Sequence, residues 1–371
     1  MIYLDNAATT KMYEGGVDIY KKYACQSFYN PSAGYREATN IAHDLDNVRN
    51  KMLAKLKATK GKIIFTGGAT ESNNLAIFGS RRNGKWEYIF SVGEHPSVYN
   101  SALELERQGF TVHFVGLQKN GQIDYNQLES MVNERTRLIS VMHVSNETGA
   151  INDLKKIDQI RQKYCPKALF HVDGVQAFCK LEFSVDDFNA DLYTFSAHKF
   201  HGPKGVGGLY VRNISSLKNI VFGGGQEEGY RSGTENVGGI MAMGFAVEHY
   251  NTQDNFEKVA SLQKVFLKCL DGAGVEYLKT DNPYIVSASF KGVNGETLMR
   301  VLQDKGVLVG IGSACSAKKA GNRILENMGL SKDEVKSHIR ISFSEELSLN
   351  EVEMAGQIIT QTYKEILEKV K

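Results

Sequence analysis

Short apolar runs alternate with helix-like stretches along much of this chain, and that alternation limits the folds open to it. Strand-like runs lie at residues 62–66, 88–92, 111–115 and 138–144, and helical patterns follow three of them at 71–82, 98–108 and 154–163. Two further strand-like runs cover 168–172 and 190–195. Strands that alternate with helices form βαβ units, in which each crossover brings the next strand back parallel to the last. We therefore predict an α/β fold built on a mainly parallel sheet.

The pattern changes at about residue 244. Long helical patterns cover 246–270 and 351–371, and between them lie short strand-like runs at 285–290 and 307–311 and a helical stretch at 296–305. A chain of 371 residues exceeds what one hydrophobic core usually supports. We predict a large domain over residues 15–245 and a smaller α+β domain made of residues 1–14 and 246–371.

The composition argues against several other classes of protein. Hydrophobic residues make up 42%, charged residues 23%, and the net charge is +2, which is typical of an ordinary globular protein and indicates neither nucleic acid nor membrane as a partner. The first residues lack the basic lead and apolar core of a signal peptide. The five cysteines are odd in number and include no Cys-x-x-Cys pair, which argues against a disulfide framework or a zinc site. We expect a cytoplasmic enzyme without a bound metal, in which any special cysteine is a free thiol.

An acid and an amine follow two successive strand-like runs. Asp173 closes the run 168–172, and Lys199 follows the run 190–195. In an open α/β sheet, ligands bind beyond the carboxyl ends of the strands, so both side chains are expected at one site. A lysine that forms a Schiff base and an aspartate that keeps a ring nitrogen protonated suit pyridoxal phosphate. The alternatives are a solvated surface lysine and an aspartate that caps a helix.

Small residues after the run 62–66 suit a phosphate group. Gly67, Gly68, Ala69 and Thr70 lead into a helical pattern, where backbone N–H groups and a threonine hydroxyl can surround an anion. Ser196 and His198, just before Lys199, could add donors. Taken alone, this segment is more simply an ordinary glycine turn with a threonine cap. It is not a Walker loop, because no Gly-Lys-Ser/Thr follows.

Polar side chains near other strand ends are candidates for contacts with the cofactor ring. His95 follows the run 88–92 and could stack on a planar ring and move protons near neutral pH. Asn146 follows the run 138–144, and Gln176, three residues after Asp173, could bond a ring oxygen. The alternatives are a hydrogen-bonded loop histidine and an asparagine that initiates a turn.

Two candidates lie in the predicted small domain. Cys315 has small residues before it and two lysines shortly after it, a pattern that favours an exposed, electropositive loop and a reactive thiolate. The alternative for a lone cysteine is a small buried hydrophobe. Arg340, between two isoleucines, offers a bidentate partner for an amino-acid carboxylate. Its alternative is a surface salt bridge.

Together these segments resemble the cysteine desulfurases, the NifS/IscS-like branch of the class-V aminotransferase family of fold-type I pyridoxal-phosphate enzymes. The resemblance covers nearly the whole chain, although each motif alone is a weak signal. The matching segments, in the order of the family, are residues 3–10, the turn 68–71, Glu94-His95, the segment around Asn146, His171-Val172-Asp173, residues 196–199, residues 231–234, residues 312–315 and Ile339-Arg340.

The resemblance implies a fold and a set of contacts to the cofactor. It implies a seven-stranded sheet in the large domain, with Lys199 linked to pyridoxal phosphate and Asp173 at its ring nitrogen. His95 would lie on the face of the ring, and Gln176 and Asn146 on its oxygen side. The side chains implied at the phosphate are Ala69, Thr70, Ser196 and His198, with Thr234 supplied by a neighbouring subunit, so a homodimer is implied.

The resemblance also implies a reaction. Arg340 and Asn146 would bind the substrate L-cysteine, Lys199 would remove its α-proton, and Cys315 would take its sulfur. L-Alanine would leave, and the persulfide on Cys315 would pass its sulfur to an acceptor protein of iron–sulfur cluster assembly, tRNA thiolation or a cofactor pathway. The chain departs from the usual family pattern at Tyr35, Arg36 and Ser344, which bears on the acceptor more than on the chemistry.

Other functions stay open at this point. A selenocysteine lyase or an aminotransferase-like enzyme could use the same scaffold, although transamination needs no thiol such as Cys315. A regulatory partner could bind the cofactor without turnover. A nucleotide-binding oxidoreductase is disfavoured, because no Gly-x-Gly-x-x-Gly follows the first strand.

Overall fold

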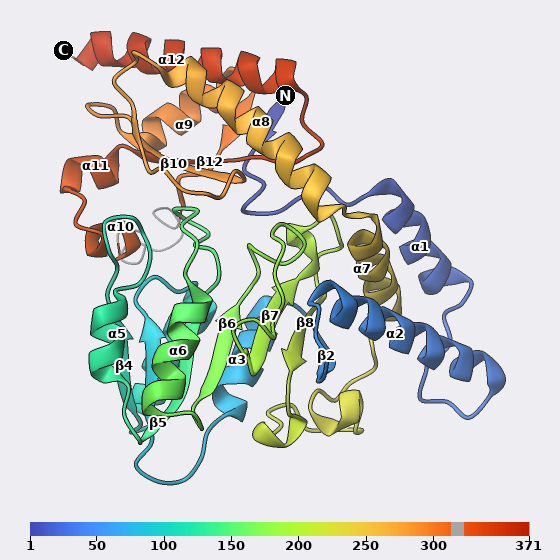
Figure 1. Cartoon of the computed structure of the whole chain (residues 1–371). Helices are drawn as coiled ribbons and strands as arrows, with labels where there is room; N and C mark the ends of the chain where they lie inside the picture. Colours follow the sequence, from blue (N-terminus) through green and yellow to red (C-terminus); the bar gives the residue numbers. More distant parts are fainter. Residues whose placement is uncertain (313–322, 371) are drawn as a thin grey trace.

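A seven-stranded sheet forms the centre of the larger part of the molecule (Figure 1). The computed structural model describes residues 1–312 and 323–370. The strand order is β2-β8-β7-β6-β5-β3-β4, with β8 antiparallel to both neighbours and the other pairs parallel. The predicted α/β fold with a mainly parallel seven-stranded sheet is confirmed. The strands are β2 Lys62–Thr66, β3 Glu87–Ser91, β4 Thr111–Val115, β5 Thr136–Met142, β6 Leu169–Asp173, β7 Leu192–Ser196 and β8 Gly207–Val211.

Helices cover both faces of this sheet and make a three-layer sandwich. Successive residues of a strand point to opposite faces, so Ile63 and Phe65 of β2 pack with one set of helices and Ile64 with the other. Because β3, β6 and β7 are buried along their whole length, a ligand can reach them only at their ends. One face carries α3 (Ala69–Gly79) and α4 (Pro96–Arg107), and the other carries α2 (Arg36–Lys55), α5 (Tyr125–Met131), α6 (Leu154–Tyr164) and α7 (Val237–His249), on which α1 (Glu14–Cys25) packs.

A second hydrophobic core lies above the sheet in Figure 1, where α8 and α12 lie side by side. Its strands form an antiparallel sheet of order β12-β10-β9 and a parallel pair, β1 with β11. Ile2 and Leu4 of β1 pack in this core with side chains from residues 259–363. The domain limits 15–245 and 1–14 with 246–371 stay a prediction. The elements are β1 Ile2–Leu4, α8 Thr252–Leu270, β9 Glu276–Tyr277, β10 Ile285–Ser289, α9 Gly295–Asp304, β11 Val307–Val309, α10 Arg323–Asn327, α11 Lys332–Lys336, β12 His338–Ser342 and α12 Leu349–Val370.

Two local predictions differ from the structure. The single helix predicted over 246–270 is wrong, because α7 ends at His249 and α8 begins at Thr252. The side chain of Asn251 accepts a hydrogen bond from the backbone N–H of Asp254 and thereby caps a new helix. β8 is not predicted, because it opens with two glycines, which are depleted in strands and give the run the character of a turn.

Gly207 lets β8 approach the turn between β2 and α3. A Cβ atom at this position would lie 2.6 Å from the carbonyl oxygen of Phe195 and 2.9 Å from Cα of Gly68. Both neighbours are backbone atoms, which side-chain rotation does not move away. Gly68 itself has a φ of 143°, so the turn needs glycine on conformational grounds as well. The close approach holds the amino terminus of α3 against the strand ends.

We predict that Gly207→Ala destabilises the protein by about 1–3 kcal/mol, the usual cost of overpacking in a closely packed interior. Gly34→Ala is the matched control, since its Cβ would meet no atom within 4 Å. Urea denaturation of both variants beside the wild type measures the difference. Equal stability of the two variants would contradict the close contact at Gly207.

Candidate active site

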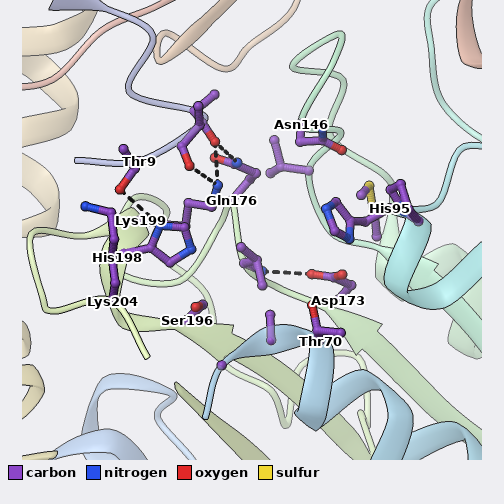
Figure 2. A pocket seen from close by; sticks show the side chains of 18 of the residues that line it. Thr9, Thr70, His95, Asn146, Asp173, Gln176, Ser196, His198, Lys199 and Lys204 are labelled. Atoms are coloured by element: carbon purple, nitrogen blue, oxygen red, sulfur yellow. Dashed lines mark hydrogen bonds between the residues drawn. The ribbon is translucent and has the colours of Figure 1, made fainter. Parts of the chain in front are cut away.

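The sequence candidates gather around one cavity of about 1150 Å³ at the carboxyl edge of the central sheet (Figure 2). Its wall comes from the loops after β2, β3, β5, β6 and β7, with residues 7–9, Gly312 and Arg340 closing it from the other side. Their positions in the wall agree with the predicted location, and the chemical role of each candidate stays a prediction. The candidates in the wall are Ala69, Thr70, His95, Asn146, Asp173, Gln176, Ser196, His198, Lys199 and Arg340.

Lys199 lies one turn of 3₁₀ helix beyond β7. Its Nζ donates hydrogen bonds to the carbonyl oxygens of Ala7 and Ala8, both at 2.7 Å. Burial is the main cause that lowers the pKa of Lys199 to about 7, and the positive charges of Lys180 and Arg340 lower it further. The carboxylates of Asp5 and Asp173 act in the opposite direction. Near neutral pH a large share of Lys199 is therefore an uncharged amine, which is the nucleophilic form.

Asp173 and His95 approach the cavity from neighbouring parts of the sheet edge. Asp173 is buried at the end of β6, where Oδ1 accepts from the backbone N–H of Val175 at 3.1 Å and Oδ2 accepts from Nδ2 of Asn73 at 2.9 Å. His95 follows β3 and caps α4. Burial lowers the pKa of His95, and the charges of Lys199 and Arg323 lower it further against the opposing effect of Asp173. The imidazole is therefore mainly uncharged at neutral pH.

The amino terminus of α3 forms one end of the cavity. Ala69 and Thr70 are its first residues, and the first N–H groups of a helix have no partner within the helix. Ser196 and His198 line the same cavity, and Nδ1 of His198 lies 3.1 Å from Oγ1 of Thr9. Burial, followed by nearby cationic groups, lowers the pKa of His198 to about 3, so this ring acts as a neutral donor. Lys204, which has no role in the prediction from sequence, also lines this cavity and adds a positive side chain to its wall.

Gln176 and Asn146 lie on another side of the cavity. Nε2 of Gln176 donates to the carbonyl oxygen of Ala7 at 2.9 Å. Nδ2 of Asn146 donates to Oε1 of Glu147 at 3.0 Å. Among the described residues, Oδ1 of Asn146 is buried without a hydrogen-bond partner. An acceptor left in this state is costly, and it is readily satisfied by a donor group of a ligand.

Arg340 projects from β12 and is already engaged by protein groups. Nη2 donates to Oδ1 of Asp5 at 2.8 Å, and Nη1 donates to the carbonyl oxygen of Asn146 at 2.9 Å. Oε1 of Glu147 lies 3.8 Å from Nη1. Within residues 1–312 and 323–370, Nε of Arg340 has no hydrogen-bond partner. A substrate carboxylate would therefore share this guanidinium with Asp5. Asp5 lies in the family-like segment 3–10, but the sequence alone assigned it no role at the site.

Lys180 is a buried lysine behind the cavity that sequence reasoning missed. Its Nζ donates to Oε1 of Gln176 at 3.2 Å and lies 5.4 Å from the centre of the Tyr284 ring. Burial lowers the pKa of Lys180 to about 8, while Glu345 counteracts this shift. Lys180 thus holds the amide of Gln176 with its NH₂ group directed away from the lysine. Lys180 lies four residues after Gln176, and this spacing was the available sequence signal for a contact between the two side chains. The spacing can be interpreted only when the local backbone structure is known.

Two candidates remain, Thr234 and Cys315. Thr234 is exposed and is not among the residues that line the cavity. Cys315 lies outside the described residues. Gly312, three residues before Cys315, forms part of the cavity wall. Arg323, eight residues after Cys315, donates a hydrogen bond to the carbonyl oxygen of Glu94, the residue before His95.

The donor set of the cavity fits pyridoxal phosphate. A partly deprotonated lysine can link to its aldehyde, and a buried carboxylate can face its ring nitrogen. The helix amino terminus with Thr70 and Ser196 suits its phosphate. Among the described residues, no group of three or more His, Cys, Asp or Glu side chains is arranged to bind a metal ion. In the same part of the chain, each helix is too short or too polar to cross a bilayer.

Comparisons with known proteins agree with this geometry. The model of the family described as aminotransferase class-V matches residues 2–354. The chain is 35% identical over 382 residues to cysteine desulfurase IscS of Anaeromyxobacter sp. (strain Fw109-5), covering 99% of this chain and 93% of that protein. It is 37% identical to a NifS/IcsS protein homolog of Lactobacillus delbrueckii subsp. bulgaricus, and the match covers 95% of this chain and 94% of that protein.

Solved structures extend the similarity to three dimensions. A NifS-like protein matches with a TM-score of 0.91 and 29% identity over 99% of both chains. A structure described as SspA in complex with cysteine matches with a TM-score of 0.84 and 34% identity, covering 93% of this chain and 99% of that one.

We predict that Lys180→Met raises the pKa of Lys199 above its value of about 7, because one of the positive charges that disfavour the ammonium form is lost. Competitive acetylation of amines across a pH series, read by mass spectrometry of the Lys199 peptide, measures this pKa in cofactor-free protein. Lys180→Arg is the control that keeps the charge and should titrate as the wild type does. A Lys180→Met protein with an unchanged Lys199 titration would contradict the electrostatic coupling.

Proposed function

This chain belongs to the class-V aminotransferase family, and we propose that it is a pyridoxal-phosphate-dependent cysteine desulfurase, like the IscS and NifS-like proteins that it resembles. The observation that carries the proposal is the meeting of Lys199, with a pKa of about 7, and buried Asp173 in one cavity. The cavity is also lined by Arg340 and by Gly312, three residues before Cys315 in the sequence. The reaction yields L-alanine and a persulfide on Cys315.

Each part of the cofactor has a matching group in the cavity. Lys199 would be the attachment point, Asp173 would pair with the ring nitrogen, and His95 would contact the ring. Gln176 and Asn146 would bond the ring oxygen. When bound, pyridoxal phosphate supplies an electron sink that stabilises negative charge at the α-carbon of an amino acid. Its phosphate would be held by Ala69, Thr70, Ser196 and His198.

The chain's own residues then bind the substrate and move its protons. Arg340 and Asn146 hold the carboxylate of L-cysteine, with Asp5 sharing the guanidinium. Lys199 removes the α-proton, and its low pKa makes the free amine available near neutral pH. Burial lowers the pKa of His95 and keeps its imidazole mainly uncharged, so the ring would contact the cofactor without adding a positive charge.

Cys315 is proposed as the sulfur acceptor within the enzyme. Its thiolate attacks the substrate sulfur, the carbon–sulfur bond breaks with its electron pair left on carbon, and protonation of that carbon leads to L-alanine. The described cysteines are poor alternatives. Cys179 is buried with its pKa raised to about 12, and burial also raises the pKa of Cys269. None of the four described cysteines lines the cavity.

We further propose that the enzyme is a homodimer. Thr234 is exposed and does not line the cavity of its own subunit, as expected if it contacts the phosphate in a neighbouring one. Arg231, three residues earlier, donates to Oε1 of Glu71 at 2.8 Å, and Glu71 lines the cavity. This bond holds the segment 231–234 near the cavity mouth.

The four described cysteines are free thiols, which supports a reducing compartment such as the cytoplasm as the place of action.

We predict that Cys315→Ser retains the cofactor but loses persulfide and sulfide formation from L-cysteine, because serine has no thiolate to accept sulfur. Mass spectrometry of the wild type after cysteine addition should show one added sulfur on the Cys315 peptide. Cys25→Ser removes an exposed cysteine and is the matched control, with wild-type activity expected. An unchanged rate of alanine formation in Cys315→Ser would reject the proposed role of this thiol. Retained cleavage of selenocysteine alone would favour a selenocysteine lyase.

The dimer is tested by mixing inactive protomers. Lys199→Ala and Thr234→Ala protomers mixed in equal amounts should recover up to about a quarter of the wild-type activity, because about half of the dimers are hybrids and one of the two cavities in each hybrid contains an intact lysine and an intact threonine. Lys199→Ala mixed with Asp173→Asn is the control and should stay inactive, since both residues line the same cavity of one chain. A fully active monomer in sedimentation would reject the proposal.

A further inference from the structure

A continuous path of hydrogen bonds joins Asp173 to His95 behind the cavity wall. Nδ2 of Asn73 donates to Oδ2 of Asp173 at 2.9 Å and to Oγ of Ser97 at 2.9 Å. Oγ of Ser97 lies 2.8 Å from Nδ1 of His95, and the backbone N–H of Ser97 donates to the same Nδ1 at 3.1 Å. Asn73 lies on α3 and Ser97 on α4, so the path ties two helices to the end of β6.

The direction of every bond in this path is set by its donors. A backbone N–H can only donate, so Nδ1 of His95 must be an acceptor, and the neutral ring carries its proton on Nε2. The single hydrogen of the Ser97 hydroxyl then points to Nδ1, and its oxygen accepts from Asn73. The two amide hydrogens of Asn73 are divided between Ser97 and Asp173.

The orientation of the Asn73 amide is set by Asp173. Asn73 is fully buried, and its Oδ1 has no hydrogen-bond partner among the described residues. A reversed amide would place this oxygen against a carboxylate oxygen of Asp173, where both atoms are acceptors. The structure therefore leaves one buried acceptor unpaired in order to present both amide hydrogens to Ser97 and Asp173.

We infer that Asn73 and Ser97 are positioning residues that orient the Asp173 carboxylate and hold His95 as the neutral tautomer protonated on Nε2. The inference deepens the proposed function, because it concerns two side chains that the proposal assigns to the cofactor. A proton added to His95 would have to enter at Nδ1 and break both bonds from Ser97. His95 thus stays an uncharged ring at the pH at which Lys199 is a free amine.

Charged neighbours of His95 act on the same equilibrium. Asp173 at the end of β6 favours the imidazolium ion, whereas Lys199 after β7 and Arg323 at the start of α10 oppose it. Burial is the largest cause that lowers the pKa of His95. The bonds from Ser97 add a geometric cause, since they stabilise the neutral ring alone. Removing the hydroxyl therefore separates the contribution of the hydrogen bond from that of the charges.

The test is histidine-selective ¹⁵N NMR of the enzyme with its cofactor and after the cofactor has been removed. The nine histidines are assigned by substitution, with His95→Gln identifying the ring of interest. The wild type should show the Nε2-protonated tautomer in both states. Ser97→Ala should raise the proton affinity of His95 by about tenfold, the order expected for one lost hydrogen bond to the neutral form. Ser97→Thr keeps a hydroxyl and should restore the wild-type titration.

Two further variants separate the ends of the path. Asn73→Leu should change both the His95 titration and the ¹³C carboxyl resonance of Asp173, whereas Ser97→Ala should change only the former. Ser101→Ala is the matched control on α4, because its hydroxyl donates to the carbonyl oxygen of Ser97 and leaves the path intact. An Nδ1-protonated ring in the wild type, or equal His95 titrations in Ser97→Ala and Ser101→Ala, would overturn the inference. These NMR readings need no turnover, so a result that overturns the inference does not contradict the proposed desulfurase reaction. Conversely, an enzyme that fails to desulfurate L-cysteine but shows the Nε2-protonated His95 would contradict the proposed function and not the inference.

Discussion

The hydrogen-bond register between β5, β6 and β7 sets the geometry of the cavity. Met142 pairs with Asp173, so β5 and β6 end at the same level of the sheet. Asp173 pairs with Thr194, and β7 continues two residues further to Ser196. The side chains that follow each end are thereby brought into one space, with Lys199 one short helical turn beyond β7. A slip of one residue in any of these pairs would turn the site-facing side chains to the opposite face. Because the strands are buried on both faces, such a slip would also place polar groups in the core.

The amino-terminal segment closes the cavity and joins it to the second hydrophobic core. Ala7 offers its carbonyl oxygen to both Lys199 and Gln176, and Asp5 binds Arg340. Leu4, immediately before Asp5, is fully buried in the second core. Packing of β1 in that core therefore fixes the position of the carbonyl groups that hold the lysine. Arg340 and Lys199 are thereby connected through a few consecutive residues at the start of the chain.

Burial controls the protonation states at the site. It lowers the pKa of Lys199 to about 7 and that of Lys180 to about 8, because an ammonium group loses its hydration inside the protein. It lowers the pKa of His198 to about 3, which leaves that ring neutral. Arg340 and Lys204 keep positive charge in the cavity wall, and this suits a ligand that brings a phosphate and a carboxylate. The cavity thus combines cationic side chains with groups whose basicity burial has lowered.

The sequence alone determined the fold class and the location of the site, because carboxyl ends of parallel strands meet at one edge and each motif follows a strand-like run. Asp173, Lys199 and His95 could be placed in this way. Tertiary structure alone decided the supporting contacts: Asn73 reaches Asp173 and Asp5 reaches Arg340 across 100 and 335 residues of chain. It also placed β8 between β2 and β7, where its glycines allow close approach to the turn after β2. Local patterns encode periodicity and turns, whereas the partner of a buried polar group depends on how distant segments pack.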